Sequence, residues 1–104
     1  MIARIWRGVV HTDDAEVYAD YIRETGFSEY GRTAGNRGAH MLRRDEDGRT
    51  EFITLSFWDS RDAIRAFAGD DIEKAVLYPG DEQYLIESDP LVKHFEVADT
   101  IEPA

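Results

Sequence analysis

Cysteine is absent from the 104 residues, so the chain can form no disulfide and offers no thiolate to a metal or a substrate. Long apolar runs are absent too, because no segment approaches the roughly 18 residues that span a bilayer. Arginines interrupt the apolar residues of the N-terminal stretch, which is unlike a signal peptide. We therefore expect a cytoplasmic protein with no membrane segment.

Positive charge is scarce. The 12 lysines and arginines are outnumbered by 22 aspartates and glutamates, which gives a formal net charge of -10 at pH 7. A field of this sign repels polyanions unless the cations gather in a patch. Arg43, Arg44 and Arg49 do cluster, but the acidic residues 45–47 between them neutralise the cluster. We therefore expect no nucleic-acid partner.

Apolar residues make up 42% of the chain, which is enough for one core, and 104 residues is a usual length for one domain. We take residues 1–104 as a single domain. Apolar and polar residues alternate, as in half-buried strands, at residues 2–11, 38–44, 49–58 and 91–97. Asp47-Gly48 is a hairpin signal, so the second and third of these strands should pair antiparallel.

A first helix is predicted after the first strand. It begins near Asp13, which together with Glu16 resembles a capping box, and it ends at Gly26. Its apolar stripe consists of Val17, Tyr18, Tyr21 and Ile22. A loop with one short helical turn should occupy residues 27–37.

A second helix is predicted after the third strand. It begins at about Arg61, behind a cap at Asp59-Ser60, and reaches Gly69. Residues 72–78 resume helical spacing until Pro79-Gly80 ends it. A short turn over residues 81–87 then leads to the last strand.

The predicted order of elements is strand, helix, strand, strand, helix, strand. This order is typical of the ferredoxin-like α+β fold, βαββαβ, in which two helices cover one face of an antiparallel sheet. The other face has no helix to cover it, yet apolar residues recur at strand period in Ile5 and Val9, Ile53 and Leu55, and Phe95 and Val97. An uncovered apolar face predicts a second subunit, so we expect a homodimer.

Several segments give the chain a resemblance to a known family. They are the strand at 2–11, the loop GNRG at 35–38, the segment FWDS at 57–60 with Ala63 and Phe67, Tyr78-Pro79, and the strand VKHFEV at 92–97. In these segments the chain resembles the antibiotic biosynthesis monooxygenase-like proteins of the dimeric α+β barrel superfamily. The resemblance implies that two protomers join their sheets into a barrel and that each protomer keeps a pocket between sheet and helices.

The same resemblance implies a role for Trp58, which matches the family's pocket tryptophan at the end of the third strand. Members include cofactor-free monooxygenases of polycyclic aromatic phenols and haem-degrading monooxygenases. The haem-degrading members have an asparagine on the first strand and a histidine on the second helix, and this chain has neither. The quinone-forming members have an asparagine just before the tryptophan, where this chain has Thr54 and Ser56.

Side-chain parity indicates which residues share a face of the sheet. Thr54, Ser56 and Trp58 point the same way along their strand. If His94 points to that face as well, these four residues line one cavity. A mostly apolar cavity with a few polar groups is typical of a small-molecule site, and we expect a small aromatic ligand there. Further candidates for its wall are Trp6, Tyr21, His40 and Tyr78.

His94 is the candidate general base, because an imidazole exchanges protons near neutral pH. The alternative for His94 is a structural hydrogen bond, and the alternative for Trp58 is to fill the core. His11, His40 and His94 lie on three different strands without the close spacing of a metal motif, so we expect no metal site.

These residues favour a cofactor-independent monooxygenase-like enzyme that acts on a small or polycyclic aromatic phenol or enol. In this hypothesis His94 deprotonates the substrate and the apolar pocket holds the anion for reaction with oxygen. Three alternatives stay open. They are a proton-transfer isomerase, cyclase or dehydratase, a haem-binding enzyme that uses His94 or His40, and a non-catalytic dimeric binding protein.

Overall fold

Five strands form one antiparallel sheet in the computed structural model, which describes residues 1–104. The strands are β1 (Ile2–His11), β2 (Asn36–Glu46), β3 (Arg49–Trp58), β4 (Leu85–Ser88) and β5 (Lys93–Glu96). β1 is central, with β3 and then β2 on one side. On its other side β4 pairs with residues 8–10 and β5 with residues 2–5. The position expected for a fourth strand is thus shared by two short strands.

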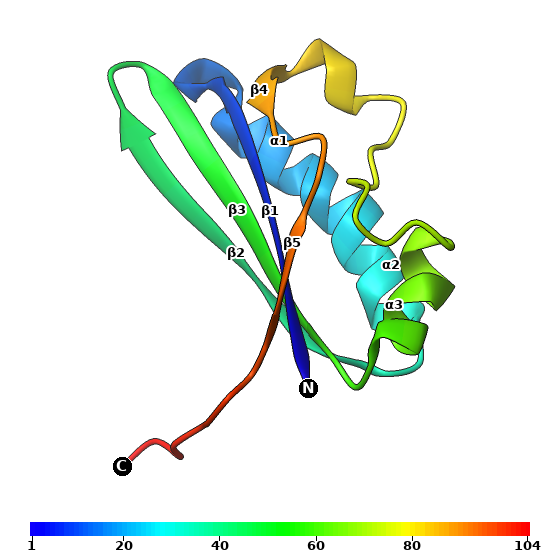
Figure 1. The fold of residues 1–104 in the computed structure, drawn as a ribbon. Coiled ribbons are helices and arrows are strands. Elements are labelled where there is room, and N and C mark those ends of the chain that lie inside the picture. Colours follow the sequence, from blue (N-terminus) through cyan, green and yellow to red (C-terminus); the bar gives the residue numbers. More distant parts are fainter.

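The helices all lie on one face of this sheet (Figure 1). α1 (Ala15–Ile22), a π-helical segment (Arg23–Phe27) and α2 (Ser28–Arg32) follow one another without a break, and α3 (Arg61–Ala68) follows β3. The ferredoxin-like α+β fold expected from the sequence is confirmed. No helix has the length and apolar character needed to cross a membrane.

The alternation predicted for β3 is confirmed. Its buried residues, which face the helices, are Thr50, Phe52, Thr54, Ser56 and Trp58. The residues between them, from Glu51 to Phe57, are half-buried on the opposite face. Period-two geometry therefore assigns every side chain of this strand to a face.

The hairpin between β2 and β3 turns at Asp47 and Gly48, whose φ angles are 53° and 76°. Positive φ at both central residues matches the twist of the flanking strands, and an Asp-Gly pair adopts it with little strain. The antiparallel pairing of the two strands is confirmed, although β2 begins earlier than predicted, at Asn36.

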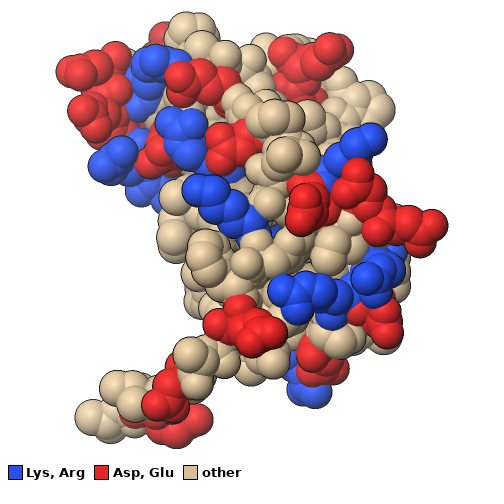
Figure 2. Space-filling view, viewed as in Figure 1, with Lys and Arg blue, Asp and Glu red and all other residues tan.

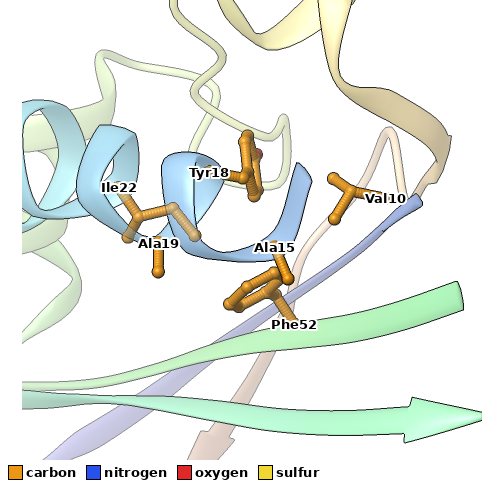
Figure 3. Close-up of a cluster of buried hydrophobic side chains, with 6 residues drawn as sticks. All are labelled: Val10, Ala15, Tyr18, Ala19, Ile22 and Phe52. Carbon is orange, nitrogen blue, oxygen red and sulfur yellow. The ribbon is translucent and has the colours of Figure 1, made fainter. Parts of the chain in front are cut away.

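Two clusters of buried apolar side chains fill the space between sheet and helices. The first lies under α1 (Figure 3) and consists of Val10, Ala15, Tyr18, Ala19, Ile22 and Phe52. The second lies toward α3 and consists of Ile2, Tyr30, Trp58, Ile64 and Ile72. Full burial of one such large side chain stabilises the fold by about 1.5–3 kcal/mol. Phe27 packs against both clusters and joins them into one core.

The first helix differs from the expectation in its start, its stripe and its end. Residues 12–14 form a 3-10 turn and α1 begins without a side-chain cap, so the predicted capping box is wrong. Val17 is 49% exposed, since the turn rotates Tyr18 and its neighbours toward the sheet instead. Gly26 does not end the helix. The helix continues because Phe27 and Tyr30 just beyond it bury their rings in the core.

Residues 72–78 do not form the predicted helix, because their backbone bonds to other segments. The carbonyls of Ile72 and Lys74 accept hydrogen bonds from the Arg4 guanidinium. Residues 73 and 75 bond to residues 92 and 90, at 2.8 and 3.0 Å, beside an isolated bridge between residues 74 and 91. The second helix itself is confirmed, since Ser60 Oγ accepts a hydrogen bond from the Ala63 N–H at 3.1 Å.

Candidate functional site

A pocket lies between the helical face of the sheet, the helices from α1 to α2, and the irregular segment 76–81. Its volume is about 40 Å³, enough for a few water molecules. Five aromatic rings line it, those of Trp6, Tyr18, Tyr30, Phe67 and Tyr78. Arg4 and Thr54 reach it from the sheet and Asp81 from the irregular segment. A mostly apolar wall with a few polar groups is the usual pattern of a small-molecule site.

Arg4 supplies the positive charge of this pocket. In the sheet it stands between Ser56 of β3 and His94 of β5, so all three side chains point to the helical face. The residue is 3% exposed. Its Nη1 donates to the Ile72 carbonyl oxygen and to His94 Nε2, the latter at 2.9 Å, and its Nη2 donates to the Lys74 carbonyl oxygen at 3.2 Å. Burial lowers the pKa of Arg4, but a guanidinium stays charged in proteins.

His94 lies behind Arg4 and outside the pocket wall. It does share the face of Trp58, the condition on which its place in the cavity depended, because His94 and Ser56 flank Arg4 in the sheet. A guanidinium can only donate, so His94 Nε2 is the acceptor and the ring carries its proton on Nδ1. Burial, and then the positive charges of Arg4 and Arg61, lower the pKa of His94. The basic nitrogen of a neutral imidazole is thus occupied by Arg4 and does not face a ligand.

Trp58 lies in the core beneath the pocket. It is fully buried, and its indole N–H donates to Ser56 Oγ at 2.9 Å. Its ring meets Tyr30 edge-on, with centroids 5.7 Å apart, and lies 5.7 Å from Phe67. Both of those rings line the pocket. Trp58 and Ser56 therefore support the wall from behind rather than contact a ligand.

Asp81 supplies the negative charge of the pocket and is also buried. Its Oδ1 accepts a hydrogen bond from the Tyr18 hydroxyl at 2.6 Å, and its Oδ2 accepts one from the Tyr78 backbone N–H at 2.6 Å. Burial, and next the hydrogen bond to Asp81, raise the pKa of Tyr18. Burial is also the main cause that raises the pKa of Tyr78 to about 12. Both phenols are therefore neutral donors at physiological pH.

Comparison with known proteins identifies the fold. No protein-family model and no curated protein matches the sequence. Among solved structures, a candidate antibiotic biosynthesis monooxygenase from Bacillus cereus has a TM-score of 0.70 and 13% identity, covering 98% of this chain and 97% of that one. The chain has the fold of the antibiotic biosynthesis monooxygenases.

Two further structures with this antibiotic biosynthesis monooxygenase fold have known ligands or chemistry. SnoaB, a cofactor-independent oxygenase from Streptomyces nogalater, has a TM-score of 0.63 and 19% identity, over 98% of this chain and 97% of that one. A mutant of MhuD with two manganese protoporphyrin IX groups bound per active site has a TM-score of 0.63 and 15% identity, over 99% and 100%. At such identities the likeness extends to the fold alone.

On this monooxygenase fold, only some of the residues predicted to line a pocket do so. Trp6, Thr54 and Tyr78 line it. Tyr21 lies one layer behind, where its hydroxyl accepts the Gly80 N–H at 2.8 Å. His40 is on the opposite face of the sheet, paired with Leu55, so its predicted place in the wall is wrong.

Several pocket residues were missed by the sequence reasoning, and three of them supply the pocket's charges and a buried hydroxyl. These are Arg4, Tyr18 and Asp81. Arg4 stands in one row across the sheet with His94, but this pairing of two distant strands is visible only in the structure. Tyr18 belongs to the apolar stripe of the first helix, and nothing in the sequence indicates that its hydroxyl reaches a pocket. Asp81 follows Pro79-Gly80 and had the sequence signature of an ordinary turn.

The residues around this pocket do not fit haem or a metal ion. The chain has no group of three or more histidine, aspartate or glutamate side chains close enough to hold a metal. The one histidine on the helical face is His94, whose Nε2 is bonded to Arg4. α3 carries no histidine, and His40 faces away. A haem would therefore find no free axial nitrogen on this face.

Proposed function

We propose that this protein is a cofactor-independent monooxygenase-like enzyme that acts on a small aromatic phenol or enol. The observation that carries the proposal is a buried carboxylate, Asp81, in a pocket walled by aromatic rings. The fold shared with SnoaB, a cofactor-independent oxygenase, supports it. The sequence argument placed the base at His94; here Asp81 takes that role, because His94 Nε2 already accepts from Arg4.

The proposed reaction begins with proton transfer. The substrate gives its acidic proton to Asp81, and the substrate anion remains in a pocket that excludes most water. The anion then reduces oxygen. One oxygen atom enters the ring to give a quinone, the other leaves as water, and the ring supplies all four electrons. The Tyr18 hydroxyl and the Tyr78 N–H hold the carboxylate of Asp81 in place throughout.

The size of the pocket favours a small substrate over a polycyclic one. A volume of about 40 Å³ is well below the roughly 150 Å³ cavity that holds a benzene ring. A ligand must therefore displace part of the wall, and segment 76–81 has the least regular structure there. A single ring requires a smaller displacement than several fused rings.

Oxygen consumption tests the proposal. Purified protein is given a panel of naphthols, hydroxyanthrones and cyclic enols in an oxygen electrode, with product identified by mass spectrometry. Asp81→Asn should lower kcat by about 100-fold or more, the usual contribution of a general base. The adjacent exposed residue offers a matched control, Glu82→Gln, which should not change kcat. Equal rates in both variants would refute the role of Asp81.

A proton-transfer isomerase, cyclase or dehydratase is the second candidate, because the same buried carboxylate serves it without oxygen. The two proposals differ in one measurement. An isomerase converts its enol substrate at the same rate in anaerobic buffer, whereas the monooxygenase stops. Turnover of a substrate without oxygen uptake would replace the first proposal by the second.

We also propose that two copies of the chain associate through the open face of the sheet. Phe95 is 52% exposed and Leu42 is 45% exposed, with Ile5 and Leu55 half-buried on the same face. Charged side chains crowd the hairpin end of the sheet, and the C-terminal tail projects away from the body (Figure 2). A second copy is a fitting occupant because it brings the same apolar surface. Sedimentation analysis should find a dimer that Leu55→Glu converts to monomers; a monomeric wild type would refute it.

A further inference from the structure

Arg4 is the exception among the arginines of this chain. Each of the other nine has a carboxylate oxygen within 4.0 Å. Arg4 has none, although the chain has an excess of acidic residues and Arg4 is the most deeply buried of the ten. Its polar partners are two backbone carbonyls and the neutral imidazole of His94. The charge of this guanidinium is therefore solvated by neutral groups and forms no ion pair within the protein.

The guanidinium also has hydrogen-bond donors to spare. An arginine has five N–H donors. Nη1 makes two hydrogen bonds and Nη2 makes one, while Nε makes none. Two N–H groups thus have no acceptor in the protein, and the side chain lines the pocket. They are enough to bind one oxyanion, and a charge-assisted hydrogen bond of this kind is about twice as strong as a neutral one.

The neighbours of Arg4 hold it in place for such a contact. His94 Nε2 and the two carbonyls fix three of the donors, and the Phe67 ring lies 5.9 Å from Cζ on one side. A guanidinium that is already desolvated and oriented loses little further freedom when an anion binds. An unpaired buried charge is costly, and the anion would offset part of that cost.

We propose that Arg4 is the anion-binding residue of the pocket, and that the ligand is an aromatic molecule carrying an oxyanion, either a carboxylate or a phenolate. This inference rests on the proposed function for the identity of the pocket as the substrate site. The oxyanion binds at Arg4 and the ring lies among Trp6, Tyr30 and Phe67. Asp81 is a separate polar group of the same pocket, whose carboxylate accepts hydrogen bonds from Tyr18 and Tyr78 rather than from Arg4, so it faces a different part of the ligand.

Matched pairs of ligands test the proposal on the wild-type protein. Benzoate is compared with benzamide, and 4-nitrophenolate with nitrobenzene, by isothermal titration calorimetry in anaerobic buffer so that no turnover occurs. At least one anion should bind ten times more tightly than its neutral partner. Equal affinities within both pairs, or no measurable binding of any of the four, would overturn the proposal. The pair in which the anion binds more tightly than its neutral partner shows whether the ligand carries a carboxylate or a phenolate.

Variants then assign the charge to Arg4. Arg4→Gln should lower the affinity for the anion at least tenfold and leave the affinity for the neutral partner unchanged. Arg7→Gln is the matched control, because Arg7 is on the same strand but faces the other side of the sheet, where it pairs with Glu51. It should bind the anion as the wild type does. A folded Arg4→Gln variant with wild-type affinity would refute the assignment, and if that variant does not fold, Arg4→Lys provides the comparison.

The two proposals can fail separately. Discrimination of anion from neutral ligand without oxygen uptake by any phenol would support the anion site and count against the oxygenase. Oxygen uptake with an oxygenated product, together with equal binding of charged and neutral ligands, would support the oxygenase and overturn the anion site.

Discussion

The bond between Tyr18 and Asp81 gives the sharpest test of how the pocket is held together. Both side chains are buried, and the hydroxyl lies 2.6 Å from Oδ1. Tyr18→Phe removes this donor and leaves the ring contacts with Phe52 and Tyr84 in place. A hydrogen bond to a charged group contributes about 1.5–3 kcal/mol. The variant should therefore be less stable than the wild type by that amount.

The loss is measurable by thermal and urea unfolding followed by circular dichroism. For a domain of this size, a change of 1 kcal/mol shifts Tm by at least about 4 °C, so a decrease of roughly 6 °C or more is expected. Protein concentration is kept fixed, because the stability of an oligomer depends on it. A double-mutant cycle with Asp81→Asn should give a coupling energy of about 1 kcal/mol or more between the two side chains.

Tyr21→Phe is the matched control for this prediction. Tyr21 is on the same helix and stacks against Tyr18, with ring centroids 6.1 Å apart, but its hydroxyl accepts from a neutral backbone N–H of Gly80. Its removal should cost only about 0.5–1.5 kcal/mol. If Tyr18→Phe is no less stable than Tyr21→Phe and the coupling energy is near zero, the reasoning about Asp81 is refuted.

Two further predictions concern the residues behind the pocket. Ser56→Ala leaves the indole N–H of the fully buried Trp58 without an acceptor, so unfolding free energy should fall by about 1–3 kcal/mol; a change below about 0.5 kcal/mol in urea unfolding would contradict this. His94 has a pKa below its ordinary 6.5, so as pH falls through 6.5 the unfolded chain binds a proton that the folded chain does not. The stability contribution of neutral His94 is therefore complete above that pH and declines below it, and Tm measured from pH 7.5 to 5.5 should fall more steeply for the wild type than for His94→Gln. Parallel pH profiles would show that His94 is not held neutral by burial and by the charge of Arg4.

The sheet and its faces could be predicted from the sequence because they follow from local patterns. Alternation in β3 assigns each residue to a face, and the Asp47-Gly48 turn fixes the hairpin. The condition set for His94, that it share the face of Ser56, is met in the structure, but counting along one strand could not show it. Counting from the hairpin also pairs His40 with Leu55, on the face opposite Thr54, because the register runs unbroken from residue 39 to residue 46. The place proposed for His40 in the wall did not follow this parity.

The rest of the site depends on contacts between distant segments. Residues 72–78 have helical spacing, but Arg4 and residues 90–92 take the hydrogen-bonding groups that a helix would use. No local pattern shows that an arginine in a strand is buried, since such a residue usually faces water. The charged groups of the pocket were missed for this reason, whereas its aromatic wall was partly predicted.

The way in which segment 76–81 is attached bears on how this pocket can change during evolution or engineering. Just before the pocket-lining residues Val76, Leu77 and Tyr78, the chain is bound to residues 90–92 by backbone hydrogen bonds and a β-bridge. Backbone attachment places no demand on the three side chains that follow. Combinatorial libraries at these positions should therefore alter ligand selectivity while most members still fold, which makes this stretch the most adaptable part of the scaffold.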